Sequence, residues 1–576
     1  MTETVITLGG KAGQGLITVS DLLLRYLSRS GHFVFAAQDY MSRVRGGHNF
    51  MQIRIASDPV FAPLPTSHIL VAFDQRTVDE HKDELIIPAL VLHDIDDVKA
   101  SGNATFIGIP IKMFAREAGH PVYGNSVALG AIAAVIGLRL DGLITLLTES
   151  FGKKGGDAAQ KNVQAATRGY NYVRDAFPFI GVTLPRPGEK PKMLINGSQS
   201  IGLGLIAGGL QFISAYPMSP STGVFNYVTS HAAELGILSE QAEDEIASVN
   251  IALGASAAGA RAATSTSGGG LDLMAEGISL AGVAEIPIVI ANIQRPGPAT
   301  GLPTRTAQED LDLALNIGHG EFPRFVFAPG TAEEAYYTAA HAMNLADKYQ
   351  VPVFVLGDQL LVDSYVTLDK LNLGKVKYKN HLADANKVKT PYKRYQLTPS
   401  GVSPRLPYGV PDTRVMFDSH LHEEDGHITE NIEICRKMVE KRFRKLAGMI
   451  KEPLGPTLYG DKKPQITLVC WGSTYGAARE AVDALNAAGI GAALAHFNRV
   501  SPFPAKEAAT FLKGKKAVHV VEGNYQGQFA RLLARETGFK TGEPILRYDG
   551  RPFTARYILD GLKRIYGNGK FRRVSL

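Results

Sequence analysis

Short apolar runs alternate with longer amphipathic stretches along most of the chain, a pattern typical of α/β proteins. An alternating run from Thr4 to Leu8 is followed by a glycine-rich segment and by a helical pattern from Leu16 to Ser28. Further strands are expected at residues 32–36, 50–55, 68–73, 89–93 and 105–109, and helices at 126–138 and 158–175. Because the segment 182–192 is rich in proline and lysine, we predict a first α/β domain over residues 1–185 and a linker over 186–192.

The same rhythm resumes after the linker. Strands are expected at 212–215, 261–266, 287–292, 325–328 and 352–356, with helical stretches between them. This alternation predicts a doubly wound, mostly parallel sheet with both faces covered, over residues 193–370. Residues 371–463 are polar and are expected to wrap over the surface, with one helix near 430–446. A last α/β domain is predicted over residues 464–576, which makes three α/β domains in all.

Composition narrows the class of protein without identifying it. The chain is 45% hydrophobic and 20% charged, and its net charge of +6 is too small to indicate nucleic acid or a membrane as partner. No apolar run is long enough for a transmembrane helix, and no secretion signal is apparent at the N-terminus. Cys435 and Cys470 are the only cysteines, too few for the usual four ligands of an iron–sulfur cluster. We therefore expect a cytoplasmic protein without a disulfide framework.

The segment from Tyr216 to Ser221 is the strongest candidate for a ligand site. It follows a predicted strand, and Pro217 and Pro220 fix φ on either side of Met218 and Ser219. Ser221 or Thr222 is expected to cap the following helix. A rigid loop beyond the carboxyl end of a parallel strand is a common place for ligands in α/β sheets.

Acidic residues open the next predicted helix at Glu243, Asp244 and Glu245. They could simply complement the helix dipole. The helix is otherwise apolar, however, so a carboxylate on its inner side would be buried and its pKa would be raised. Arg295 follows the apolar strand and opens a loop rich in proline, glycine and threonine. It could be structural, or it could bind a substrate carboxylate with its guanidinium fork.

Two further loops have more than one interpretation. The segment from Gly10 to Gly15 matches neither a phosphate-binding P-loop nor the dinucleotide fingerprint, so it forms a tight turn or contacts an anion at the helix N-terminus. The basic segment 42–48 is either a solvated loop or a contact for phosphate or a partner. The cluster from Asp418 to His427 fits no standard zinc spacing, and a polar loop is expected there.

In combination, these motifs resemble the 2-oxoacid:ferredoxin oxidoreductases, which depend on thiamine diphosphate and CoA. Tyr216–Ser221 is similar to the family's Tyr-Pro-Ile-Thr-Pro-Ser motif, and 245–268 looks like its pyrimidine-binding helix and strand. Residues 294–311 look like the 2-oxoglutarate-type α subunit, and 1–185 resemble a γ subunit fused ahead of it. Residues 522–528 resemble a motif of the α subunit's C-terminal domain, which is similar to that of transketolase.

The resemblance implies a role for each matched residue. Glu245 matches the glutamate that hydrogen-bonds N1′ of the aminopyrimidine, and it is expected to be catalytic together with Arg295. The substrate would contact Ser219, Arg295 and Thr304, and the cofactor would contact Tyr216, Pro217, Met218, Glu245 and Gly268. Met218 and Ser219 stand where the family usually has isoleucine and threonine, which affects the expected substrate fit more than the chemistry.

Features that are missing from the chain imply a partner. Gly357-Asp358-Gln359 lacks the second glycine of the Gly-Asp-Gly motif that holds Mg²⁺ and diphosphate. The resemblance implies a β subunit that carries this motif, Mg²⁺ and a [4Fe-4S] cluster, in an α2β2 enzyme that uses ferredoxin.

The expected substrate is 2-oxoglutarate, whereas pyruvate and branched-chain 2-oxoacids are alternatives. Two other functions stay open: a non-redox thiamine lyase or transferase, and a non-catalytic scaffold that binds CoA or a nucleotide.

Overall fold

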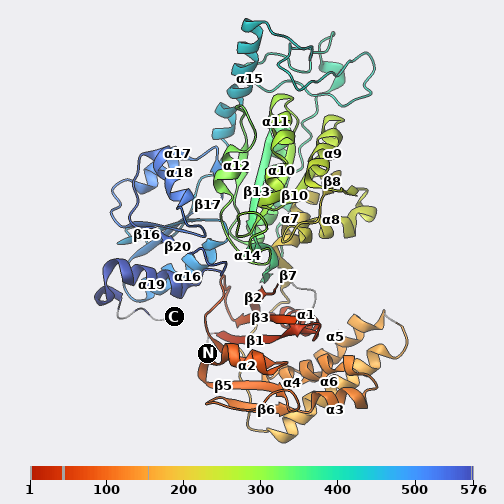
Figure 1. Ribbon diagram of the computed structural model, residues 1–576, viewed down its shortest axis with the longest axis vertical. Coiled ribbons are helices and arrows are strands. Elements are labelled where there is room, and N and C mark those ends of the chain that lie inside the picture. Colours follow the sequence, from red (N-terminus) through yellow and green to blue (C-terminus); the bar gives the residue numbers. More distant parts are fainter. Residues whose placement is uncertain (1–2, 42–45, 154, 572–573, 575–576) are drawn as a thin grey trace. The chain divides into compact units, whose positions relative to one another are not determined.

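The computed structural model describes residues 3–41, 46–153, 155–571 and 574 (Figure 1). The chain forms two compact units: one extends to Ile195 and includes Ser364–Leu371, and the other contains Asn196–Asp363 and the rest of the chain from Asn372. Both units alternate helices with strands, which confirms the predicted α/β class. Among the described residues, no helix is both long enough and apolar enough to cross a bilayer.

The first unit is built on a mixed eight-stranded sheet of order β6-β5-β4-β1-β3-β2-β14-β7. Its strands are β1 (Glu3–Ala12), β2 (Phe33–Asp39), β3 (Gly46–Ala56), β4 (Ser67–Ala72), β5 (Leu85–Asp94), β6 (Thr105–Ile109), β7 (Met193–Asn196) and β14 (Tyr365–Leu368). Its α-helices are α1 (Leu16–Arg29), α2 (Gln75–His81), α3 (Ile111–Glu117), α4 (Gly124–Val135), α5 (Leu140–Gly152) and α6 (Ala158–Ala176). The almost wholly buried α4 packs against α1, α3, α5 and α6, where Gly130 and Gly169 bring α4 and α6 into backbone contact.

The segment from Gly10 to Gly15, predicted to form a tight turn, differs from this prediction at its N-terminal end. β1 continues through Gly9 and Gly10 to Ala12, so the turn is confined to the residues just before α1. Gly13 and Gly15 adopt positive φ there, and Gly15 lies so close to Asn125 that a side chain would collide with it. Residues 42–45 of the predicted basic loop lie outside the described residues, whereas His48 belongs to β3.

The second unit is built on a seven-stranded sheet of order β18-β12-β13-β11-β10-β8-β9, parallel except at β18. Its strands are β8 (Phe212–Ala215), β9 (Leu238–Gln241), β10 (Ala262–Thr266), β11 (Ile288–Gln294), β12 (Phe325–Phe327), β13 (Pro352–Asp358) and β18 (Arg499–Ser501). Its α-helices are α7 (Gly197–Ala207), α8 (Thr222–Leu235), α9 (Glu245–Ala257), α10 (Gly268–Leu273), α11 (Ala275–Val283), α12 (Leu311–Asn316), α13 (Ala332–Tyr349) and α14 (Gln359–Asp363). Every residue of β11 and β13 is buried, as expected of central strands covered on both faces.

The C-terminal part of the second unit carries a five-stranded sheet of order β15-β17-β16-β19-β20. Its strands are β15 (Thr457–Gly460), β16 (Ile466–Trp471), β17 (Ala492–Phe497), β19 (Val518–Glu522) and β20 (Ile545–Leu546), with helices α16 (Thr474–Ala487), α17 (Ala505–Leu512), α18 (Gln528–Thr537) and α19 (Ala555–Tyr566). β18 leaves this part of the chain to pair antiparallel with β12. One apolar core therefore continues from the central sheet into the C-terminal sheet.

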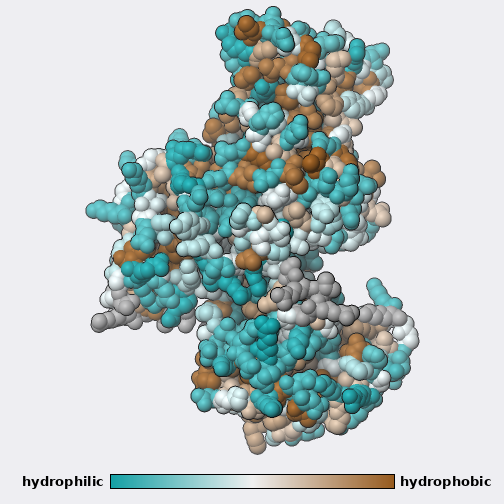
Figure 2. All heavy atoms as spheres, viewed as in Figure 1, coloured by the Kyte–Doolittle hydropathy of each residue, from teal (hydrophilic) through white to brown (hydrophobic). Residues whose placement is uncertain are grey.

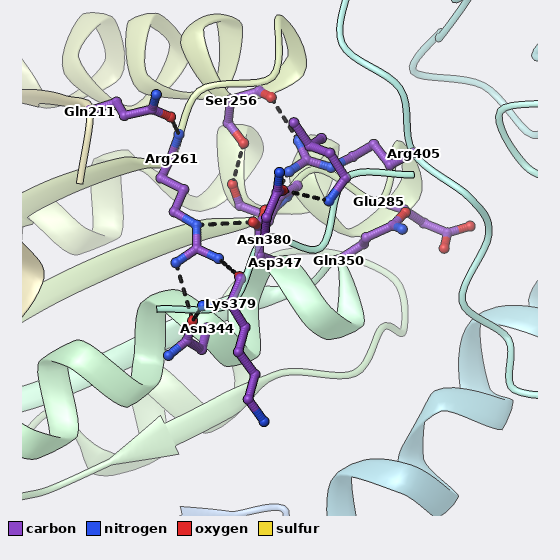
Figure 3. A network of polar contacts seen from close by, with 12 residues as sticks. Gln211, Ser256, Arg261, Glu285, Asn344, Asp347, Gln350, Lys379, Asn380 and Arg405 are labelled. Atoms are coloured by element: carbon purple, nitrogen blue, oxygen red, sulfur yellow. Dashed lines mark hydrogen bonds and ion pairs between the residues drawn. The ribbon is translucent and has the colours of Figure 1, made fainter. Parts of the chain in front are cut away.

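Residues 372–456 form a connector that precedes the C-terminal sheet in the sequence. It is mostly irregular apart from the 3₁₀ turns η3 (Leu373–Lys375) and η4 (Ala385–Lys387) and the helix α15 (Ile432–Ile450). Figure 3 shows how buried charges hold this connector: Asp347 of α13 pairs with both Arg261 and Arg405. Arg405 also donates to the carbonyl of Ser256 at 3.0 Å. A second buried ion pair joins Glu285 to Lys441 of α15, at 2.6 Å. Buried ion pairs thus bind the connector to the parallel sheet and its helices.

Hydrophilic residues cover most of the face drawn in Figure 2, with hydrophobic residues scattered among them. Ile432 and Ile450, near the two ends of α15, are among the exposed hydrophobic residues.

Candidate active site

The predicted ligand loop and the predicted catalytic residues lie at one edge of the parallel sheet. β10 pairs in parallel with both β8 and β11, so the carboxyl ends of these strands lie side by side. The Tyr216 loop follows β8, Gly268 begins the helix after β10, and Arg295 follows β11. Because ligands bind beyond the carboxyl ends of parallel strands, this edge is the candidate active site.

The Tyr216 loop lies at the surface of this edge. Tyr216 is 38% exposed, Pro217 and Ser219 are exposed, and Met218 is half-buried. Ser221 occupies the cap position of α8, but its hydroxyl donates back to the carbonyl of Met218 at 2.7 Å. The predicted N-cap position at Ser221 is therefore confirmed, but its side chain makes no capping hydrogen bond. The hydroxyl closes the loop on itself rather than accepting from the helix.

Glu245 is separated from its acidic neighbours by the way α9 begins. The carboxylate of Asp244 accepts from the backbone N–H of Ala247 at 2.7 Å and caps the helix. Glu243 is exposed, whereas Glu245 is only 3% exposed, and its Oε1 has no hydrogen-bond partner among the described residues. Burial raises the pKa of the Glu245 carboxyl, the charge of Asp244 adds to the rise, and the charge of Arg295 opposes it.

Arg295 connects the two loops of the site. Its Nη1 donates to the carbonyl of Ser219 at 2.7 Å, so the structure brings these two predicted residues together. Burial lowers the pKa of the Arg295 guanidinium, and the carboxylates of Asp310 and Glu245 counteract this. The Nε atom of Arg295 is buried and has no partner among the described residues.

Buried polar atoms without partners gather at this edge. Within the part of the chain that the structure describes, they include atoms of Ser214, Glu245, Ser265, Ser267, Asn292 and Arg295. Most buried polar groups in folded proteins are hydrogen-bonded, because an unpaired group costs about 1–3 kcal/mol. A concentration of unpaired groups on three neighbouring strands, just beyond two of them and at the start of α9 therefore indicates a place for a polar ligand.

Asp310 was not selected as a site residue from the sequence, yet it lies in this edge. Its carboxylate accepts from Asn292 Nδ2 at 2.9 Å, and its backbone N–H donates to Gln294 Oε1 at 3.1 Å. Burial raises its pKa to about 6, and the Asn292 amide opposes this rise. One available signal was Asn292 itself, because an amide inside an otherwise apolar strand needs a polar partner.

The loop after Arg295 is held from the C-terminal part of the second unit. The backbone N–H of Gln308 donates to the Gly523 carbonyl, the Gly523 N–H donates to Gln308 Oε1, and both distances are 2.8 Å. The Gln308 amide also donates to the Trp471 carbonyl, and Asn524 donates to the Gln308 carbonyl. Thr304, at 7% exposure, lies within this bound loop. The motif at 522–528 thus fixes the loop that carries predicted substrate residues.

Two other candidates have structural partners of their own. Asp358 is buried, and its carboxylate accepts from Ser473 Oγ and, at 2.9 Å, from the backbone N–H of Leu361. The carboxylate therefore links the start of α14 to the segment that contains Ser473. The Asp418–His427 segment forms a small hairpin with a bridge between His422 and Ile428, and His422 packs on Tyr395. Among the described residues, no group of three or more potential ligands could hold a metal ion.

Family models match most of the chain. Residues 203–441 match "Pyruvate flavodoxin/ferredoxin oxidoreductase, thiamine diP-bdg", and residues 5–172 match "Pyruvate ferredoxin/flavodoxin oxidoreductase". Residues 465–558 match "Pyruvate:ferredoxin oxidoreductase core domain II". The thiamine-binding family model includes every candidate site residue from Tyr216 to Asp310.

Similar proteins cover the chain from end to end. The alpha subunit of the 2-oxoacid:ferredoxin oxidoreductase of Saccharolobus solfataricus is 32% identical, over 99% of this chain and 98% of that protein. The 2-oxoglutarate oxidoreductase subunit KorA of Mycobacterium tuberculosis is 27% identical over 92% of this chain and 87% of its own length. A solved structure, 2-oxoglutarate:ferredoxin oxidoreductase from Magnetococcus marinus with 2-oxoglutarate, coenzyme A and succinyl-CoA bound, matches with a TM-score of 0.91. It is 31% identical and covers 98% of this chain and 99% of its own.

These matches, together with the site at the carboxyl edge of the parallel sheet, confirm the resemblance found in the motifs. The chain belongs to the family of 2-oxoacid:ferredoxin oxidoreductase alpha subunits.

Proposed function

We propose that the chain is the catalytic alpha subunit of a CoA-dependent 2-oxoglutarate:ferredoxin oxidoreductase. The enzyme would convert 2-oxoglutarate, CoA and oxidised ferredoxin into succinyl-CoA, CO₂ and reduced ferredoxin, and it could also run in the reductive direction. One observation carries the proposal: the buried, unpaired carboxyl oxygen of Glu245, at the same sheet edge as Arg295. The similar proteins from Mycobacterium tuberculosis and Magnetococcus marinus, both named for 2-oxoglutarate, support this choice of substrate.

The residues at the edge fit thiamine diphosphate. The free Oε1 of Glu245 could accept from or donate to N1′ of an aminopyrimidine. Gly270 leaves room for that carboxyl, since a Cβ there would lie 2.6 Å from Glu245 Oε1. The bound cofactor supplies a nucleophilic carbon and an electron sink for decarboxylation of a 2-oxoacid.

The residues of this chain would do the binding and the proton handling. Glu245, whose burial favours the protonated form, would hold the proton shared with N1′. Tyr216, Pro217, Met218 and Gly268 would line the cofactor. Arg295 would bind the substrate carboxylate, with Ser219 and Thr304 beside the substrate. Pyruvate and branched-chain 2-oxoacids are the alternative substrates, since no contact in the structure identifies the group that would bind a second carboxylate.

The proposal includes a partner subunit that completes the site. Asp358 is occupied by Ser473 and by the start of α14, which leaves this chain without a free Gly-Asp-Gly motif for Mg²⁺ and diphosphate. A β subunit with that motif and a [4Fe-4S] cluster would supply these groups and pass electrons to ferredoxin, in an α2β2 assembly in the cytoplasm.

The proposal also assigns a role to each part of the chain. Residues 1–185 would be a γ-type domain joined by the linker 186–192, and 193–370 would bind the pyrimidine. Residues 371–463 would form the connector and 464–576 a transketolase C-terminal-like domain. β7 and β14 lie beyond residue 185 in the sequence and complete the sheet of the first unit.

The decisive experiment replaces Glu245 in the assembled enzyme. Glu245→Gln keeps the shape of the side chain but removes its acid–base function, so 2-oxoglutarate-dependent ferredoxin reduction should fall by about 10²- to 10⁴-fold. Glu243→Gln, a change of the same kind on an exposed residue, is the matched control and should leave the rate unchanged.

Size-exclusion chromatography would show whether the Glu245 variant still assembles. A correctly assembled Glu245→Gln enzyme with near-normal turnover would refute the proposed chemistry. Initial rates with 2-oxoglutarate and pyruvate test the substrate separately, and a clear preference for pyruvate would overturn that choice.

A further inference from the structure

Asp310 sits where a helix-capping residue belongs but does not cap. It immediately precedes α12, yet its side chain makes no capping hydrogen bond to that helix. An aspartate in this position usually accepts from the free N–H groups of the first turn. Here the carboxylate instead accepts from Asn292 Nδ2, on the strand that ends at Arg295. The side chain of Asp310 therefore contacts a strand of the candidate site instead of capping α12.

The surrounding residues fix the position of this carboxylate. Gln294 holds the backbone of Asp310 through a 3.1 Å hydrogen bond. On another side, Gly268 lies so close that a Cβ there would be 2.6 Å from Asp310 Oδ1. The carboxylate therefore lies against the start of α10, one of the elements that line the predicted cofactor site.

The charges around Asp310 are unbalanced. The charged groups that act on it are the acidic Glu309 and Asp272 and the basic Arg295. Glu309 accepts from the backbone N–H of Gly297 at 2.8 Å, and Asp272 is exposed. Arg295 in turn is influenced by two carboxylates, Asp310 and Glu245. When Asp310 is ionised, it competes with any incoming carboxylate for the charge of Arg295.

We propose that Asp310 is a positioning residue whose ionisation sets how strongly Arg295 binds the carboxylate of the substrate. The inference rests on the proposed function, because it takes Arg295 as the group that binds the 2-oxoacid. Asn292 and Gln294, on the strand that ends at Arg295, hold Asp310 in place, and Gly268 lies against its carboxylate. A change of charge at Asp310 therefore alters the attraction rather than the geometry.

The direction of the pH effect follows from the state of the Asp310 carboxyl. Burial raises its pKa to about 6, so it is mostly neutral below that pH and mostly ionised above it. In its neutral form Asp310 no longer competes with the ligand for the charge of Arg295. Carboxylate binding should therefore weaken as the pH rises from about 5 to 8, by roughly threefold to tenfold for one nearby charge.

Calorimetry on the assembled enzyme can test this without turnover. The dissociation constants of glutarate and of propionate would be measured from pH 5.5 to 8 for the native enzyme and for Asp310→Asn. Asparagine has the size of aspartate, and its amide can donate to Asn292 Oδ1, which is buried and unpaired. The variant should bind both acids roughly threefold to tenfold more tightly at pH 8 and should lose most of the pH dependence.

Two controls separate electrostatic positioning from structural support. Asp272→Asn removes the same charge from an exposed position nearby and should change the dissociation constants by less than about twofold, because water screens it. In an Arg295→Gln background, Asp310→Asn should have no further effect, since the two substitutions act on one interaction.

Unchanged binding and unchanged pH dependence in Asp310→Asn would overturn the inference. Weaker binding at every pH together with a lower melting temperature would also overturn it, in favour of a purely structural role. The proposed function fails on a different result, namely the absence of ferredoxin reduction with any 2-oxoacid in the native enzyme.

Discussion

Three consecutive acidic residues at the start of α9 have three different environments. Asp244 satisfies the helix N-terminus, Glu243 faces solvent, and Glu245 points into the protein without a partner for Oε1. A buried carboxyl without a hydrogen bond is unfavourable in a protein that folds for stability alone. The cost is understandable at a site where a ligand completes the hydrogen bond.

Substitution of the glycines after β10 would test how tightly the Glu245 carboxyl is held. A Cβ at Gly270 would lie 2.2 Å from Thr266 Oγ1 and 2.6 Å from Glu245 Oε1. Gly270→Ala should therefore displace the carboxyl, lower turnover by about 100-fold and destabilise the fold by about 1–3 kcal/mol.

Gly269 offers the matched control. A Cβ there would meet only the Ala299 carbonyl, at 3.9 Å, and alanine favours the helix by up to about 1 kcal/mol over glycine. Gly269→Ala should retain activity and melt at the same or a higher temperature. Turnover and melting curves of both variants would check this, and equal effects of the two substitutions would contradict it.

The sequence suggested Glu245 and Arg295 as candidate site residues but not Asp310, and the difference is physical. Glu245 opens an apolar helix and Arg295 ends an apolar strand, so local patterns suggest burial for both. The environment of Asp310 depends on Asn292 and Gly268, which belong to other strands and helices and meet it only in the folded sheet. The amide of Asn292 within an apolar strand indicates that a polar partner exists, but no local pattern identifies Asp310 as that partner.

At the scale of elements, strands with strong apolar runs were predicted well. The prediction for β8 matches the structure, and those for β10, β11 and β13 differ by only a few residues at the ends. The short strands β9, β14 and β18 were missed. β14 pairs with β2 and β18 with β12, which are far away in the sequence, and no local pattern indicates such pairing. The connector was predicted to be irregular with one helix, and α15 is that helix.

Asp347 determines how firmly the connector holds to the parallel sheet. Its carboxylate pairs with two buried arginines, Arg261 and Arg405, and Arg405 comes from the connector itself (Figure 3). Asp347→Ala would leave both guanidinium groups buried without a counter-charge. Loss of one partner of a buried ion pair costs about 3–5 kcal/mol, so we expect a clearly lower melting temperature. Limited proteolysis should cleave first within residues 372–431.

The adjacent residue supplies the comparison. Lys348 pairs with Glu452 at 2.5 Å but is about half-exposed, so Lys348→Ala should cost no more than about 1 kcal/mol. If the two variants melted together, or if the connector of Asp347→Ala resisted protease as the native chain does, the buried ion pair would not be what holds it.

At the scale of the whole molecule, the proposed function divides the thiamine site between this chain and a β subunit. Among the described residues, Glu245 Oε1 and Arg295 Nε have no hydrogen-bond partner, whereas the Asp358 carboxylate accepts from Ser473. Cys470 is buried within β16, where burial strongly raises the pKa of its thiol, and Cys435 donates to the Thr429 carbonyl at 3.6 Å. Cys435 lies on α15 and Cys470 on β16, and two thiols are too few for the usual four cysteine ligands of an iron–sulfur cluster.

The chain should therefore be inactive by itself and active only with a partner. Purified alone, it should show no 2-oxoacid-dependent ferredoxin reduction above background, because electrons released by decarboxylation have no acceptor within reach. Co-expression with a subunit that carries Gly-Asp-Gly and cluster cysteines should restore turnover. The same partner with Glu245→Gln should not, which would show that activity arises at the site of this chain. Turnover by the isolated chain with thiamine diphosphate and Mg²⁺ would contradict a divided site.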